Sequence, residues 1–90
     1  MAVLLINYDL NREQGSKRDY DAFYAVIKRY DWRQISESSY AIVSNEAPQT
    51  VYEKLAPNVD GDDRALVFKL SNPYHGRHSK DVVDWLAANV

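Results

Sequence analysis

The sequence contains no cysteine, which excludes disulfide frameworks, thiolate metal sites and a cysteine nucleophile, and which fits a reducing compartment. It also contains no apolar stretch long enough to span a membrane, and no basic segment followed by an apolar one of the kind that marks a secretory leader. We therefore expect a soluble, cytoplasmic protein with no membrane partner. Repeats, linkers and low-complexity segments are absent as well, so the 90 residues are expected to form one domain, 1–90.

Basic residues are not in excess either, because the chain has 11 Lys and Arg residues and 13 Asp and Glu residues, which gives a net charge of −2. A chain with this balance has no overall attraction for phosphate backbones, so binding to RNA or DNA would require a local basic patch. Ser-His-Asp order, a Walker loop and a dinucleotide fingerprint are also missing. The enzyme classes that depend on those motifs have no support.

An apolar run from Ala2 to Ile6 opens the chain and predicts a buried strand that extends to Leu10. Five apolar residues in succession must point to both faces of a pleated strand, so both faces of this strand should be covered. Asn7, Tyr8 and Asp9 then interrupt the run. A carboxylate is thus expected where the most deeply buried strand emerges.

The remaining elements follow from periodicity and turn signals. Helical spacing predicts one helix from Ser16 to about Tyr30, with Tyr20, Phe23, Tyr24 and Ile27 on its buried face. A second helix should begin near Asn45 to Pro48 and end at Pro57, with Ala47, Val51 and Leu55 as its apolar stripe. Strands are expected at 32–36, 39–44 and 64–70. Ser79 should cap a last helix whose apolar side carries Val82, Trp85, Leu86 and Asn89 or Val90.

The order strand, helix, strand, strand, helix, strand predicts an α+β fold, a ferredoxin-like βαββαβ sandwich with an added C-terminal helix. In that topology the first and third strands are central and the first two helices cover one face of the sheet. The first, third and fourth strands are nevertheless apolar on both faces. We expect the last helix to cover part of the second face and a second copy to cover the rest, in a two-fold homodimer packed sheet to sheet.

Several short motifs resemble a known family. Tyr8-Asp9-Leu10 after the first strand, the tyrosine-rich helix and the corner Ser38-Ser39-Tyr40 resemble the small CRISPR-associated ferredoxin-fold protein that accompanies the spacer integrase. The chain is more closely similar to the bacterial SinR-like group of that superfamily. The shared motifs are Tyr8-Asp9-Leu10-Asn11, Ser39-Tyr40 leading into Ile42-Val43-Ser44, Val67-Phe68-Lys69-Leu70-Ser71 and Asp84-Trp85-Leu86.

This resemblance implies a homodimeric sheet sandwich that handles nucleic acid. For the CRISPR-associated branch it also implies that Asp9, the matching carboxylate, binds Mg²⁺ or Mn²⁺ for phosphodiester cleavage. The chain departs from that branch at Ser36, where the family usually has glutamine, and in having a C-terminal helix where the branch often has a fifth strand.

One carboxylate is a poor site for Mg²⁺, which takes six oxygen ligands. Two-fold symmetry would bring together Asp9 from each copy, with Asn7, Asn11 and Ser38 as groups of the outer shell. The alternative is that Asp9 only accepts backbone hydrogen bonds in the turn that leaves the strand.

Arg12, Lys17 and Arg18 surround the same strand exit and form a candidate nucleic-acid-binding patch. The alternative is that they are solvated side chains whose field Asp19 and Asp21 cancel. His75 and His78 are too few for a zinc site without a third ligand. Most of the eleven aromatic residues fall at core-facing spacings, so packing explains them before base stacking does; Tyr74 is expected to be exposed.

Three functions stay open on the sequence. The first is a nucleic-acid-handling homodimer that acts as a weak metal-dependent endonuclease through paired Asp9 side chains. The second is a non-catalytic interaction or adaptor protein, in which Asp9 only shapes a turn. The third is a small ribonuclease toxin, since that class shares the fold.

Overall fold

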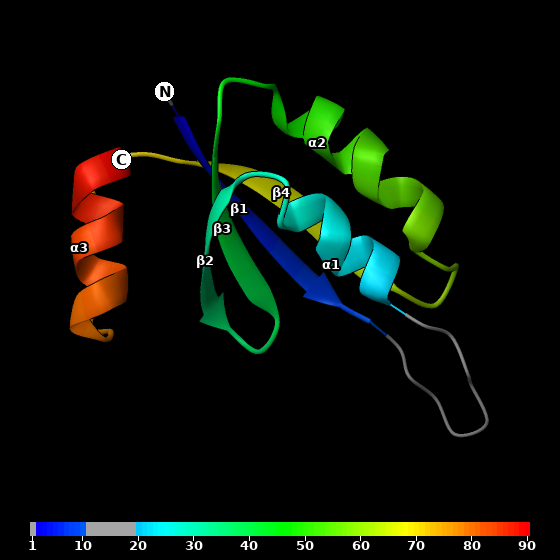
Figure 1. The fold of residues 1–90 in the computed structure, drawn as a ribbon, viewed down its shortest axis with the longest axis horizontal. Coiled ribbons are helices and arrows are strands. Elements are labelled where there is room, and N and C mark those ends of the chain that lie inside the picture. The colour runs from blue at the N-terminus through cyan, green and yellow to red at the C-terminus, as the bar shows by residue number, and fades with distance from the viewer. Residues whose placement is uncertain (1, 11–19) are drawn as a thin grey trace.

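The computed structural model describes residues 2–10 and 20–90, and within them it shows an α+β fold with one four-stranded antiparallel sheet and three α-helices (Figure 1). The elements are β1 (Ala2–Asp9), α1 (Asp21–Ile27), β2 (Asp31–Ser36), β3 (Ser39–Ser44), α2 (Pro48–Leu55), a 3₁₀ turn (Ala56–Asn58), β4 (Arg64–Leu70) and α3 (Lys80–Asn89). The predicted bounds of β3 and β4 are confirmed.

The helices differ more from prediction than the strands do. The predicted start of the first helix at Ser16 lies outside the described residues, and α1 ends at Ile27, earlier than expected. The chain tightens there, because the amides of Arg29 and Tyr30 bond to carbonyls only three residues back. Pro48 occupies the first turn of α2 as predicted, but Ala47 is the exposed N-cap residue, so its assignment to the apolar stripe was wrong.

The strand order in the sheet is β2-β3-β1-β4, so the first and third strands are central, as predicted. All three strand pairs are antiparallel. In the register, Ile6 of β1 lies opposite Tyr40 on one side and Val67 on the other. This order is compatible with a ferredoxin-like fold.

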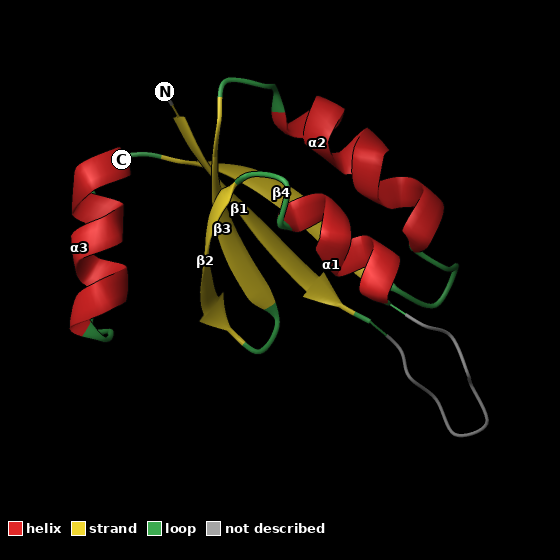
Figure 2. Ribbon diagram, in the orientation of Figure 1, coloured by secondary structure: helices red, strands yellow, loops and turns green. Residues whose placement is uncertain are grey.

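One face of the sheet is covered by α1 and α2, and the main core lies between them and the strands (Figure 2). The alternation of a strand sends Leu4, Ile6 and Tyr8 to this face. Burying an apolar side chain of this size stabilises a fold by about 1.5–3 kcal/mol. The fully buried side chains from the helices are Phe23, Ile27, Val51 and Leu55.

The other face of the sheet is covered only in part, by α3. Trp85 packs there with Val3 and Ala41, and Nε1 of Trp85 donates a hydrogen bond to Asp31 Oδ1 at 3.2 Å. The predicted cap is confirmed, since the Ser79 hydroxyl accepts a bond from the amide of Val82. The prediction that the last helix covers part of this face is therefore confirmed, and covering by a second copy stays a prediction.

Candidate functional site

Asp9 is the last residue of β1, and its side chain is exposed. Its partner across the strand pair is Arg64, the first residue of β4. Within the described part of the chain no ion pair joins these two side chains. Because alternate residues of β1 share a face, Asp9 lies on the sheet face opposite α1 and α2, together with Leu5 and Asn7.

Of the residues predicted to support Asp9, the structure brings Ser38 to it. Ser38 lies in the turn between β2 and β3, and its carbonyl accepts a 2.9 Å hydrogen bond from the amide of Tyr8, which ties the turn to the end of β1. Asp9 and Ser38 line one open hollow, which we call the Asp9 hollow; its other lining residues are Tyr8, Leu10, Tyr24 and Glu37. Asn7 is exposed but does not line it. The predicted residues Asn11, Arg12, Lys17 and Arg18 lie outside the described residues.

A single chain offers few ligands for a metal. Among residues 2–10 and 20–90, no group of three or more His, Asp or Glu side chains could hold an ion. His78 is engaged otherwise, because Nε2 donates to the Ile35 carbonyl at 2.7 Å and Nδ1 accepts from the amide of Ser79 at 2.8 Å. A divalent cation at Asp9 would therefore need ligands from a second copy or from a substrate.

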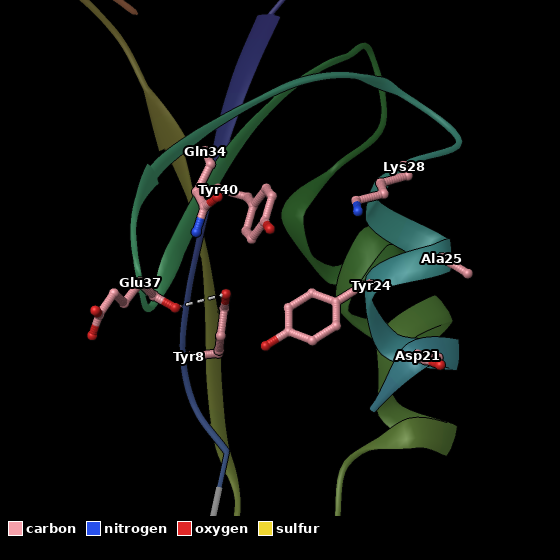
Figure 3. Close-up of a pocket in the computed structure, with 8 residues that line it drawn as sticks. All are labelled: Tyr8, Asp21, Tyr24, Ala25, Lys28, Gln34, Glu37 and Tyr40. Carbon is pink, nitrogen blue, oxygen red and sulfur yellow. Dashed lines mark hydrogen bonds between the residues drawn. The ribbon is translucent and has the colours of Figure 1, made fainter. Parts of the chain in front are cut away.

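Next to the Asp9 hollow lies a second open pocket, of about 370 Å³, between α1 and the ends of the strands (Figure 3). We call it the tyrosine pocket. Its lining residues are Tyr8, Asp21, Tyr24, Ala25, Lys28, Gln34, Glu37 and Tyr40. It shares Tyr8, Tyr24 and Glu37 with the Asp9 hollow, so the two form one continuous surface.

Three rings form the wall of the tyrosine pocket. The ring centroid of Tyr8 lies 5.9 Å from that of Tyr24 and 6.1 Å from that of Tyr40, and Tyr24 and Tyr40 are 6.0 Å apart. The Tyr8 hydroxyl donates a 3.0 Å hydrogen bond to the Glu37 carbonyl, which holds this ring in place (Figure 3).

The hydroxyls of the other two tyrosines are not engaged in this way. Tyr40 is only 7% exposed, yet its hydroxyl has no hydrogen-bond partner among the described residues, and the same holds for Tyr24. Burial raises the pKa of Tyr40 above its usual 10.0, and the neighbouring Tyr24 adds to this, so the Tyr40 hydroxyl keeps its proton. In Figure 3 both hydroxyls point into the space between α1 and the sheet.

This pocket was not predicted from the sequence. Tyr20, Phe23 and Ile27 are buried as predicted, but Tyr24, which shares their helical spacing, is only half-buried. Tyr74 is exposed as predicted. One signal was present, since polar Gln34 shares a strand face with Trp32 in β2 and Lys28 follows Tyr24 by one helical turn.

A comparison with protein-family models finds none that matches the chain. No helix of the described residues has the length and apolar character needed to cross a bilayer. Fold and site together define a small α+β domain with an exposed strand-end carboxylate beside an aromatic pocket.

Proposed function

We propose that this protein is a ferredoxin-like homodimer of the CRISPR-associated type, which handles nucleic acid and cleaves phosphodiesters weakly with Mg²⁺ or Mn²⁺ through paired Asp9 side chains. The observation that carries the proposal is the position of Asp9 on the open face of the sheet. On that face Leu66 and Phe68 of β4 are 59% and 48% exposed.

The register places these groups together. Leu5 lies opposite Phe68, Asn7 opposite Leu66 and Asp9 opposite Arg64, and residues that oppose each other in a ladder point to the same face. An open apolar surface on a sheet favours association with a second sheet. Two copies that pair through this face would bury Leu5, Leu66 and Phe68 and carry the Asp9 carboxylates toward the symmetry axis.

The residues available fit a divalent cation in such a dimer. Two carboxylates and substrate phosphate oxygens are ligands that Mg²⁺ accepts. A bound ion would polarise the phosphate and lower the pKa of an attacking water. Asp9 would hold the ion, and Ser38, which lines the same hollow, would orient groups around it.

A second candidate function is a non-catalytic interaction module built on the same dimer. It is favoured by the net charge of −2 and by the fact that Asp9 is the single carboxylate that each chain would offer to the metal. In this case the open sheet face is an assembly surface and Asp9 shapes the strand exit.

Asp9→Asn distinguishes the two candidates. We expect purified protein to cleave single-stranded RNA or DNA only with Mg²⁺ or Mn²⁺, and Asp9→Asn to lower the rate by about 100-fold or more, since even outer-shell changes cost 10–100-fold. The measurement is the initial cleavage rate on labelled oligonucleotides.

The matched control is Asp62→Asn, which removes an exposed carboxylate in the loop before β4. It should cleave at the wild-type rate. Equal rates for wild type and Asp9→Asn would mean a contaminating nuclease, and no cleavage by wild type would leave the interaction module as the better description.

A further inference from the structure

We propose that the tyrosine pocket binds one unpaired nucleobase of a single-stranded nucleic acid. This inference rests on the proposed function and deepens it, because it states which part of the strand the protein recognises. The observation behind it is the hydroxyl of Tyr40, a residue only 7% exposed, which faces the open pocket without a hydrogen-bond partner among the described residues.

Polar atoms of largely buried side chains usually have a hydrogen-bond partner within the protein, and the Tyr40 hydroxyl instead faces an open pocket. Tyr40 packs against Tyr8 and Tyr24 and, with ring centroids 5.6 Å apart, against Trp32, so its ring is well held. Phenylalanine would serve the same packing without leaving a donor unpaired. The hydroxyl is therefore not required for packing, and it is available to an acceptor atom of a ligand in the pocket.

Charge favours a neutral ligand over a phosphate. The lining carries one cation, Lys28, against two carboxylates, Asp21 and Glu37, and the Glu37 carboxylate points away from the tyrosines (Figure 3). Gln34 donates to the Ser36 carbonyl at 3.1 Å through its amide nitrogen, which leaves its amide oxygen as an acceptor. Aromatic walls with both donors and acceptors match a base, which has a π-face and a mixed polar edge.

The size and position of the pocket agree with this ligand. A volume of about 370 Å³ lies at the lower end of small-molecule pockets, as expected for a single base with part of its sugar. The pocket is continuous with the Asp9 hollow through Tyr8, Tyr24 and Glu37. A base held at Tyr24 and Tyr40 would therefore lie next to the hollow that Asp9 and Ser38 line.

The test is the affinity of the full chain for fluorescein-labelled single-stranded decamers, measured by anisotropy, with intact strands and with fully abasic strands of the same length and charge. Wild type should bind intact strands more tightly than abasic ones. Tyr24→Leu should weaken binding of intact strands by about 5- to 100-fold, the range for one stacked base, and should leave abasic strands unaffected.

Two further variants separate binding from folding. Tyr52→Leu removes an exposed tyrosine from α2, outside the pocket, and should leave both affinities unchanged. Tyr40→Phe should weaken binding of intact strands by about 2- to 10-fold, the value of one hydrogen bond, without lowering the thermal midpoint of the free protein. A merely structural role for the Tyr40 hydroxyl would change the midpoint and not the affinity.

If Tyr24→Leu and Tyr40→Phe bind intact strands as tightly as wild type does, the base pocket is overturned while nucleic-acid handling stays in place. Equal affinity of wild type for intact and abasic strands would also overturn the base pocket and leave nucleic-acid handling in place. Failure of wild type to bind any strand would overturn both the pocket and the proposed function.

Discussion

Glu46, in the connection between β3 and α2, links three elements through one carboxylate. The Tyr30 hydroxyl, just after α1, donates to Glu46 Oε1 at 2.6 Å, the Ser44 hydroxyl donates at 3.2 Å, and Lys54 of α2 forms an ion pair with it. The bond from Lys54, followed by that from Tyr30, lowers the pKa of Glu46 below its usual 4.5.

This network makes stability depend on pH at the residue scale. A carboxyl whose pKa is lower in the folded protein stabilises the fold above the unfolded pKa, and the contribution is lost as the pH falls through 4.5 and below. We predict that Glu46→Gln is less stable than wild type near pH 7 and that the difference disappears on acidification. The measurement is urea unfolding between pH 3 and pH 8.

Glu53→Gln, an exposed neighbour on α2, is the matched control and should follow the wild-type curve. A Glu46→Gln difference that stays constant down to pH 3 would contradict the assignment.

Lys54 and Tyr30 make stability depend on pH at the alkaline end, in the opposite direction. The hydrogen bond to Glu46 raises the pKa of Lys54, and burial raises the pKa of Tyr30. Their contributions are present below the unfolded values of 10.5 and 10.0 and are lost as the pH rises through the folded ones.

At the scale of elements, α3 is held to the sheet mainly by Trp85. Trp85 is 7% exposed and packs with Val3 and Ala41. Its ring centroid lies 5.8 Å from Cζ of the Arg33 guanidinium. The segment before α3 is tied to β2 separately, through the bond from His78 to the Ile35 carbonyl. Trp85 is therefore the largest apolar contact of the helix, beside Leu86, which packs against the same cluster.

Trp85→Ala should lower the free energy of unfolding by about 3–5 kcal/mol, the usual cost of removing a buried tryptophan. The measurement is urea unfolding followed by circular dichroism. Val83→Ala on the same helix, at a position that is 43% exposed, should change stability by less than about 0.5 kcal/mol. Equal effects of the two substitutions would show that α3 is not docked through Trp85.

The elements themselves were largely predictable, because each is encoded by local periodicity and turn residues. Ser79 and the apolar spacing of Val82 and Trp85 predicted α3, and the short apolar runs in 39–44 and 64–70 predicted β3 and β4. The end of α1 was not predictable, since Lys28, Arg29 and Tyr30 are compatible with a longer helix. Tyr30, which follows the tightened turn, bonds instead to Glu46 in the connection between β3 and α2, a contact that local sequence does not reveal.

At the scale of the molecule, the candidate site depends on contacts between distant segments. Asp9 was predictable because its position at a strand end follows from the neighbouring residues. The grouping of Tyr8, Tyr24 and Tyr40 was not, because it depends on the register of β1 against β3 and on the placement of α1 over both. The exposure of Leu66 and Phe68 likewise appears only when the cover given by α3 is known.

The central claim is that the open sheet face pairs two copies and brings their Asp9 side chains together. Because the chain has no cysteine, Asp9→Cys provides one unique position for a nitroxide label. Adding Phe68→Lys should abolish pairing, because it places a charge in the apolar surface.

The deciding measurement is the distance between the two labels by double electron–electron resonance. We predict a dipolar coupling that corresponds to less than 26 Å, the intermediate dimension of one chain, and no coupling once Phe68→Lys is added. No coupling in the labelled Asp9→Cys protein, or a distance of 26 Å or more, would contradict the paired-carboxylate site.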